Sequence, residues 1–173
     1  MSLVESIILG IIQGLTEFLP VSSSGHIELG KAIFGIEEKE AGLLFTVVLH
    51  FATALSTIIV FWKDIIQIFK GLFQFKWNQE SQFAVKVILS MVPAAMVGVF
   101  LKDQIDDFYN GNVMLVSAML LVTGVILYYS DRAKNPEGPV TVKNAIMLGV
   151  VQAIAIMPGI SRSGSTIASA VMM

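Results

Sequence analysis

The sequence contains no cysteine and few charged residues. Without cysteine there is no disulfide, and the redox compartment cannot be read from the chain. Only 14% of the residues are charged, whereas an average soluble domain has about 25%. The net charge is −2, which argues against a nucleic-acid partner. The chain is instead 55% hydrophobic, with a mean hydropathy of +0.78.

Three stretches are almost free of charge: residues 43–62, 84–101 and 113–129. Only Lys86 interrupts the second of them. Each has the roughly 17–25 apolar residues that a transmembrane helix needs. A buried core helix is the alternative, but a short chain cannot bury three helices that are apolar on every face. The sequence therefore predicts an all-α integral membrane protein that crosses the membrane several times.

Positive charges collect in the loops after the first and the third stretch. They are Lys63, Lys70, Lys76, Arg132, Lys134 and Lys143. The loop at residues 102–112 has one cation, Lys102. Because lysine and arginine are enriched in cytoplasmic loops, residues 102–112 are expected to lie outside and the other two loops inside.

Two further apolar segments are too short to cross a membrane and end in serine-rich loops. Residues 6–19 lead into Pro20-Val-Ser-Ser-Ser-Gly-His26, and residues 144–157 lead into Pro158-Gly-Ile-Ser-Arg-Ser-Gly-Ser-Thr166. Without gaps, Leu9, Gly10, Gln13, Ser22, Ser24 and Gly25 align with Leu148, Gly149, Gln152, Ser161, Ser163 and Gly164. The Ser-x-Ser-Gly core carries most of the weight, because apolar segments match easily by chance.

The three predicted spans separate the two copies, and an odd number of spans turns the second copy over. This is the pattern of an inverted-topology repeat, in which short interrupted helices mark a binding site near the membrane midplane. Loop backbone lies at membrane depth only where it lines a polar cavity. Each copy is therefore predicted to begin with a re-entrant helix–loop–helix hairpin, the first entering from outside and the second from the cytoplasm.

The repeat also predicts how the chain is organised. Residues 1–138 form the first repeat, with a hairpin at about 3–35 followed by the three spans. Residues 139–173 hold the hairpin of the second repeat and none of its spans. The chain is thus expected to be a C-terminally truncated piece of a protein of about 270 residues, since both copies of such a repeat have similar lengths.

The first hairpin brings an acid and an imidazole together. Gln13 and Glu17 are four residues apart and share one helix face. A carboxylate is costly in an apolar helix, so Glu17 is predicted to be a metal ligand or an acid–base group, or else to reach the headgroups. His26 is a base or nucleophile, or a structural histidine. The candidate hydroxyl nucleophiles or phosphate ligands are Ser22, Ser23 and Ser24.

The second hairpin brings a guanidinium instead. Arg162 aligns with Ser23, and Ile156 aligns with Glu17. A guanidinium suits bidentate phosphate binding, although an arginine here could also snorkel to the interface. Backbone N–H groups at the start of the following helix favour an anion, and serines there could be N-caps. The expected substrate-binding residues are Ser22, Ser24, Gly25, Ser161, Ser163, Gly164, Ser165 and Thr166.

Glutamine and histidine side chains inside the apolar segments can have structural rather than catalytic roles. Gln13 and Gln152 occupy equivalent positions in the repeat, so both can serve in packing. His50 lies within the first span and is interpreted as a helix–helix hydrogen-bonding group.

Together these residues suit phosphoryl transfer, which depends on positioning and charge neutralisation, often with a divalent cation. The sequence has no Walker loop and no nucleotide signature. A cavity that opens toward lipid suggests a lipid phosphate as the substrate.

The two motifs, Gln13-Gly-Leu-Thr-Glu-Phe-Leu-Pro-Val-Ser-Ser-Ser-Gly-His26 and Pro158 to Thr166, resemble the signatures of the bacterial undecaprenyl-pyrophosphate phosphatase family, also called bacitracin-resistance proteins. The similarity covers the whole chain, and the family is longer at the C-terminus. It implies a hydrolase that converts undecaprenyl pyrophosphate to undecaprenyl phosphate and phosphate. This reaction recycles the lipid carrier of peptidoglycan synthesis, and so supports cell wall biogenesis, cell shape and bacitracin resistance.

The resemblance also implies a site and a location. Glu17 would be an essential acid, Ser23 a nucleophile or phosphate ligand, His26 a base or nucleophile, and Arg162 the pyrophosphate anchor. Glu17, with Gln13 where many members have glutamate, would hold a divalent cation, usually magnesium. The protein would lie in the bacterial cytoplasmic (inner) membrane, with its active site open to the external side.

A secondary transporter or flippase for an anionic lipid phosphate is the alternative, because inverted repeats with broken helices are typical of transporters. Turnover of the lipid pyrophosphate distinguishes the two. The sequence leaves open which metal binds and whether the protein forms a homo-oligomer.

Overall fold

A computed structural model describes residues 1–36, 43–102, 104–105, 112–133, 138 and 140–173. Over this part of the chain the regular structure is entirely helical, which confirms the all-α prediction. The helices are α1 (Leu3–Glu17), α2 (Ser23–Phe34), α4 (Leu43–Val60), α5 (Trp62–Leu72), α6 (Gln79–Phe100), α8 (Val113–Asp131), α9 (Val142–Ile154) and α10 (Arg162–Met172). Lys134 and most of the predicted external loop at 102–112 lie outside the described residues.

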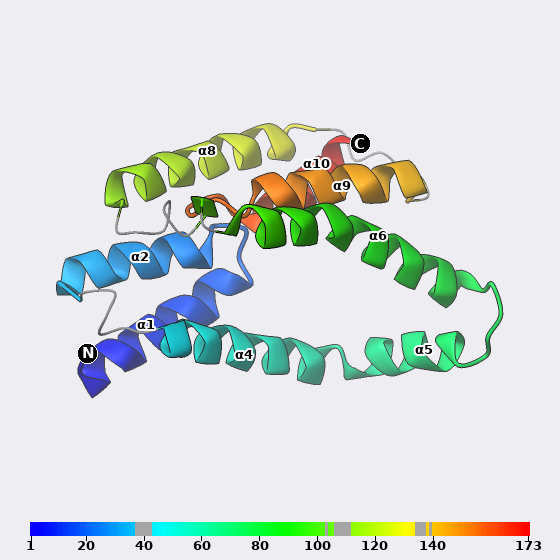
Figure 1. The fold of residues 1–173 in the computed structure, drawn as a ribbon, viewed down its shortest axis with the longest axis horizontal. Coiled ribbons are helices and arrows are strands. Elements are labelled where there is room, and N and C mark those ends of the chain that lie inside the picture. The colour runs from blue at the N-terminus through cyan, green and yellow to red at the C-terminus, as the bar shows by residue number, and fades with distance from the viewer. Residues whose placement is uncertain (37–42, 103, 106–111, 134–137, 139) are drawn as a thin grey trace.

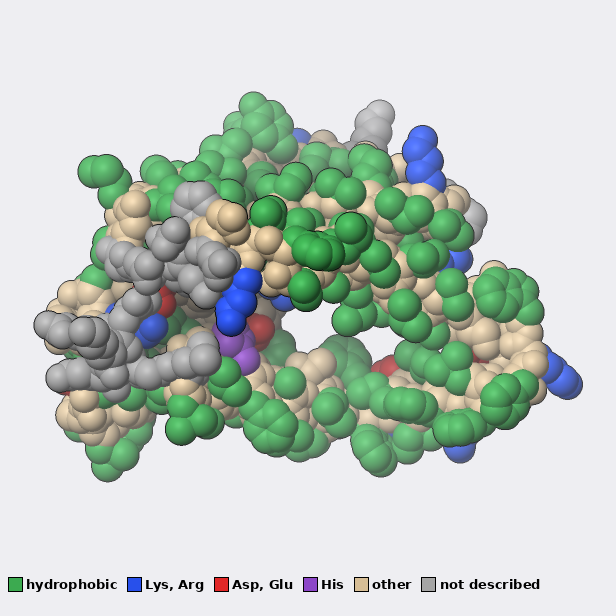
Figure 2. All heavy atoms as spheres, in the orientation of Figure 1, with side chains coloured by type: hydrophobic (Ala, Val, Ile, Leu, Met, Phe, Trp, Pro, Cys, Tyr) green, Lys and Arg blue, Asp and Glu red, His purple; other side chains and the backbone are tan. Residues whose placement is uncertain are grey.

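Among the described helices, α6 and α8 are each long and apolar enough to cross a membrane. Helices α4 and α5 pass the same test only as a pair, bent by 77° at the break between them. The apolar window of α6 contains no buried residue, and 11% of that of α8 is buried. Hydrophobic side chains also cover much of the face shown in Figure 2. Such a surface suits lipid rather than water, so the chain is a multi-pass membrane protein.

The second span was predicted at residues 84–101, but its helix begins earlier. A capping residue determines where the helix starts, and the start of the uncharged stretch does not. Helix α6 begins at Gln79, after Asn78. The Asn78 side chain accepts a hydrogen bond of 2.8 Å from the backbone N–H of Ser81. An asparagine cap satisfies one of the orphan donors of a helix start, and the polar first turn of α6 therefore remains helical.

The first span is also divided differently. The predicted stretch 43–62 becomes α4, which ends at Val60, and Trp62 starts the separate helix α5. Helix α5 carries Lys63 and Lys70 together with apolar residues. A short helix of this mixed composition suits the membrane interface.

The two predicted hairpins are present as packed helix pairs (Figure 1). Helix α1 packs against α2, and α9 packs against α10. Helix α8 contacts both α2 and α10, so it joins the two hairpins. Helix α6 lies along α9, while α4 contacts α1 and continues into α5 along the opposite side of the molecule. This arrangement places both serine-rich loops near the middle of the fold.

A glycine allows α6 and α9 to approach closely. A Cβ atom added to Gly149 would lie 2.7 Å from the carbonyl oxygen of Ser90 and 2.9 Å from the ring of Pro93. Both neighbours are fixed parts of α6, since one is backbone and the other a rigid ring. Small residues at such crossings are what allow membrane helices to pack closely.

Gly149→Ala is therefore expected to push α9 away from α6 and lower stability by about 1–3 kcal/mol, the usual range for overpacking. Thermal unfolding in detergent measures the change. The matched control is Gly98→Ala in α6, where no atom lies within 4 Å of the added Cβ and helix propensity improves. Equal unfolding temperatures for the two variants would contradict the close-approach role of Gly149.

Candidate functional site

The two serine loops end in helix caps that are built alike. The hydroxyl of Ser22 accepts a hydrogen bond of 3.3 Å from the backbone N–H of Gly25. The hydroxyl of Ser161 accepts one of 3.0 Å from the N–H of Gly164. The N-cap alternative is therefore right for Ser22 and Ser161, which start α2 and α10. The serine two residues after each cap lies beside it: the Ser22 and Ser24 hydroxyl oxygens are 3.4 Å apart, and those of Ser161 and Ser163 are 3.2 Å apart.

The two loops press directly against each other. A Cβ atom on Gly25 would lie 3.1 Å from the Cα of Gly159, and one on Gly164 would lie 2.7 Å from the carbonyl oxygen of Pro20. Gly159 also has a left-handed backbone, with φ of +91°, which glycine adopts without a steric penalty. Only residues without side chains leave room for this contact.

Helix α8 holds the second loop in place through one hydroxyl. Thr123, which is buried, donates a hydrogen bond of 3.0 Å to the carbonyl oxygen of Gly159 and accepts one of 3.0 Å from the N–H of Ser161. Backbone groups away from water need such partners. The loop that carries Arg162 is thus tied to the third predicted span.

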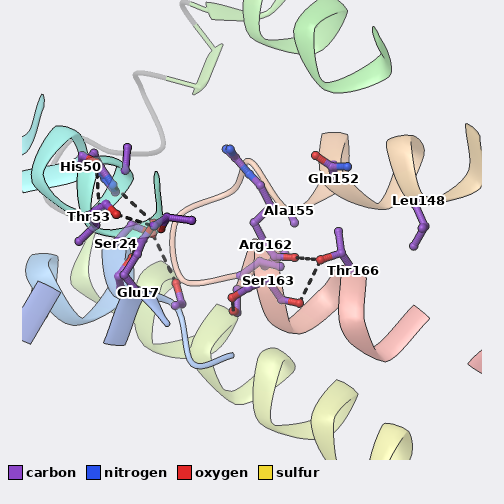
Figure 3. Close-up of a pocket in the computed structure, with 16 residues that line it drawn as sticks. Glu17, Ser24, His50, Thr53, Leu148, Gln152, Ala155, Arg162, Ser163 and Thr166 are labelled. Atoms are coloured by element: carbon purple, nitrogen blue, oxygen red, sulfur yellow. Dashed lines mark hydrogen bonds and ion pairs between the residues drawn. The ribbon is translucent and has the colours of Figure 1, made fainter. Parts of the chain in front are cut away.

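A cavity of about 750 Å³ lies where the loops meet α4 and α9. The first hairpin contributes Glu17, Ser22, Ser23 and Ser24 to its wall, and the second contributes Ser161, Arg162, Ser163 and Thr166. Figure 3 shows Glu17 and Ser24 on one side of it and Arg162, Ser163 and Thr166 on the other. In Figure 2 a hollow opens through the molecule, with acidic and histidine side chains gathered at one end. The structure therefore brings the acidic and the basic motif to one cavity.

Five of the predicted site residues do not belong to the cavity wall: Gln13, Gly25, His26, Gly164 and Ser165. The two glycines are buried and make the contact between the loops. The Nδ1 atom of His26 lies 2.8 Å from the carbonyl oxygen of Ser22, one turn back in its own helix. The Ser165 hydroxyl is buried and has no hydrogen-bond partner among the described residues.

Glu17 is the centre of a polar network that joins α1 to α4. Its Oε2 atom accepts hydrogen bonds from the hydroxyl of Ser23 and, at 3.0 Å, from the side-chain amide of Gln13. The same amide nitrogen lies 3.1 Å from Nδ1 of His50, which in turn is 3.8 Å from Oε1 of Glu17. The helix–helix hydrogen bond predicted for His50 is therefore present.

Arg162 has a different environment. It is the first residue of α10 and is exposed. Within the described part of the chain, its guanidinium has no hydrogen bond or ion pair with protein. A cation that faces a cavity without a protein partner is available to an anionic ligand.

Part of the cavity wall was missed by the motif analysis. It includes Thr53 and Thr57 of α4 and Gln152 of α9. The signal was available, because His50, Thr53 and Thr57 follow helical spacing along one face of an otherwise apolar span. Both threonine hydroxyls bond back to their own helix, at 2.9 Å to the carbonyl oxygens of His50 and Thr53.

The side chains that could hold a divalent cation are Gln13 and Glu17. No group of three or more His, Cys, Asp or Glu side chains occurs in the described residues that could hold a metal ion by itself. However, Gln13 is 1% exposed, and its Oε1 atom has no hydrogen-bond partner there. Its amide nitrogen faces the carboxylate of Glu17, and with the amide turned over, an amide oxygen and a carboxylate would fit a hard cation that takes its remaining ligands from water or phosphate.

Residues 6–173 match the family described as bacitracin resistance protein BacA. The undecaprenyl-diphosphatase of Christiangramia forsetii is 56% identical over 100% of this chain and 66% of its own length. That of Parabacteroides distasonis is 48% identical over 100% of the chain and 65% of its own length. That of Thermosipho africanus is 42% identical over 93% of the chain and 64% of its own length.

The chain thus spans about two thirds of the length of these curated relatives. The family match covers both serine loops, the cavity they line and the predicted spans between them. The resemblance carried by the two motifs is therefore confirmed, and the chain belongs to the bacitracin resistance protein BacA family.

Proposed function

We propose that the protein is a membrane phosphatase that hydrolyses undecaprenyl pyrophosphate to undecaprenyl phosphate and phosphate. The carrying observation is the cavity that Glu17 and Arg162 share with the serine hydroxyls of both loops. Its volume of about 750 Å³ is within the usual range for a small-molecule site. Relatives that cover the whole chain bear the name undecaprenyl-diphosphatase. The reaction would recycle the lipid carrier of peptidoglycan synthesis and so support resistance to bacitracin.

In this proposal the second loop binds the pyrophosphate. The guanidinium of Arg162, which is unpaired among the described residues, offers two parallel N–H donors to phosphate oxygens. The start of α10 adds the positive end of a helix dipole, which favours an anion. Ser163 and Thr166, also in the cavity wall, offer hydroxyl groups. These groups would stabilise the negative charge that develops on the leaving phosphate group.

The first loop supplies the attacking group. The Ser23 hydroxyl donates to Oε2 of Glu17, so the carboxylate can take the proton as the serine oxygen bonds to phosphorus and the bridging P–O bond breaks. Water would then release phosphate from the serine. Ser23 lines the cavity and His26 does not, which favours the serine as nucleophile and leaves His26 a supporting role through its bond to the Ser22 carbonyl.

A divalent cation, magnesium in our proposal, would be held by the carboxylate of Glu17 and the side-chain amide oxygen of Gln13, with the amide turned over from the orientation in which Nε2 faces Glu17. Such an ion neutralises phosphate charge and polarises the P–O bond. Gln13 is neutral, so Glu17 is the one carboxylate in this pair.

We propose further that the two hairpins form an inverted-topology repeat. In support, the gapless alignment pairs Leu3 with Val142 and Ser23 with Arg162, and these are the first residues of α1, α9, α2 and α10. The contacts between the loops are also reciprocal. Gly25 approaches Gly159, and the aligned residues Gly164 and Pro20 approach each other as well. Reciprocal contacts of this kind are expected when two copies face each other across a two-fold axis.

Residues 1–138 would then form the first repeat and residues 139–173 the start of the second. Because lysine and arginine are enriched in cytoplasmic loops, the positive charge of α5 and the loop after it supports a cytoplasmic position for the segment between α4 and α6. The protein would reside in the bacterial cytoplasmic membrane, with the cavity open to the external side. A transporter or flippase for a lipid phosphate shares this architecture, but does not need the hydrogen bond from Ser23 to a carboxylate.

Glu17→Gln and Arg162→Lys are each expected to lower phosphate release from undecaprenyl pyrophosphate in detergent by about 100-fold or more, as for other charge-stabilising groups. The controls are Glu28→Gln and Arg132→Lys. The native Glu28 carboxylate lies 2.8 Å from Nζ of Lys31, and Cζ of the native Arg132 lies 3.7 Å from the centroid of the Tyr128 ring. Both pairs lie outside the cavity wall. Normal release in both site variants would refute this site, and lipid transport without release would favour the flippase.

Removing divalent cations with EDTA is expected to reduce phosphate release to background, and Mg²⁺ should restore it. Glu17→Gln should show no recovery, because it lacks the charge that attracts the ion. The Glu28→Gln variant should recover fully and serves as the control. A full rate that persists in EDTA would remove the cation from the proposal.

Single cysteine variants test the orientation, since the native sequence has no cysteine. Lys102→Cys should react with a membrane-impermeant maleimide in intact spheroplasts. Lys76→Cys should react only after the membrane is permeabilised, because its loop is positively charged. The opposite pattern would invert the proposed topology and place the cavity toward the cytoplasm.

A further inference from the structure

We propose that His50 of α4 is a third ligand of the cation site, together with Gln13 and Glu17 of α1. The inference rests on the proposed cation requirement and adds a residue that neither motif contains. His50 belongs to the cavity wall, and 44% of its side chain is exposed, so an ion can reach it from the cavity. The site would thereby join the re-entrant hairpin to the first predicted span.

The distances between the donor groups support a single ion. The Gln13 amide nitrogen is 3.0 Å from Oε2 of Glu17 and 3.1 Å from Nδ1 of His50, and Nδ1 is 3.8 Å from Oε1 of Glu17. Neighbouring ligands around an octahedral ion with bonds of about 2.1 Å lie about 3 Å apart. Two of the three separations match this spacing, and the separation between His50 and Glu17, at 3.8 Å, is wider by about 0.8 Å.

The amide of Gln13 explains how the same residues serve with and without the ion. As it stands, Nε2 faces the carboxylate and the imidazole, while the buried Oε1 has no partner among the described residues. Turning the amide over exchanges the two atoms and places an oxygen between the other donors. Either orientation of the amide leaves one of its two polar atoms without a partner, so the number of unsatisfied buried atoms does not change. Without a cation the turned orientation is unfavourable, because the amide oxygen would face the Glu17 carboxylate, and both are acceptors. With a cation between them it is favourable.

An imidazole ligand has a consequence for metal preference. Carboxylate and amide oxygens suit Mg²⁺, Ca²⁺ and Mn²⁺, whereas imidazole also suits later transition metals. A site with one nitrogen and two oxygens should hold Mn²⁺ well and Ca²⁺ poorly.

Electron spin echo spectroscopy of the full chain with bound Mn²⁺ tests the proposal without any turnover. An imidazole nitrogen on the ion gives a characteristic nitrogen modulation. The chain has two histidines, so the assignment needs only two variants. We expect the modulation in the unmodified chain and in His26→Gln, and its loss in His50→Gln. Mn²⁺ affinity should fall at least about tenfold in His50→Gln, the lower bound for losing even an outer partner of a metal ligand.

Three results would overturn the proposal: Mn²⁺ bound with no nitrogen modulation, a modulation that survives in His50→Gln, or equal Mn²⁺ affinities for His50→Gln and the unmodified chain. Any of these would leave His50 as a helix–helix hydrogen-bonding group only. They would not affect the proposed phosphatase, whose test is phosphate release in the Glu17 and Arg162 variants. A circular dichroism spectrum with unchanged helix content confirms that His50→Gln is folded.

Discussion

The contact between the two serine loops organises the structure, because irregular backbone away from water needs hydrogen-bond partners within the protein. Each loop uses its own serine to cap the helix that follows it. The second loop is also bonded to Thr123 of α8, and hydroxyl groups of both loops line the cavity. Gly25, Gly159 and Gly164 make this arrangement feasible, because larger residues would separate the loops. The polar cavity is thus a direct consequence of the way in which two interrupted helices meet.

A difference between two similar hairpins accounts for the chemistry of that cavity. The caps Ser22 and Ser161 make the same hydrogen bond. The residue after each cap differs, because Ser23 bonds to a carboxylate and Arg162 is unpaired in the described structure. One fold therefore presents an acidic group and a basic group to a shared space. The proposed substrate, a lipid pyrophosphate with its charge concentrated at one end, would suit a polar cavity inside an apolar surface.

The network around Glu17 shows how a single carboxylate can serve several partners. Ser23 and Gln13 share one of its oxygens, and His50 approaches the other. Two of these partners come from the hairpin and one from α4, so the position of the carboxylate depends on how α1 and α4 pack. The proposed phosphatase would require such control, because a misplacement of about 1 Å can lower a catalytic rate about 100-fold.

The amino-acid sequence determined the all-helical class, the apolar spans and the two motifs that supply Glu17 and Arg162, because hydrophobic length and short-range spacing are local properties. The Asn78 cap at the start of α6 is also a local feature of the sequence. The boundary of the uncharged stretch at residue 84 does not reveal it. Only the tertiary structure decided that Thr53 and Thr57 face the same cavity as the motifs, and that His26 does not. It also decided that Gln13 reaches His50, since a helix pattern indicates which face is polar but not which neighbouring helix that face meets.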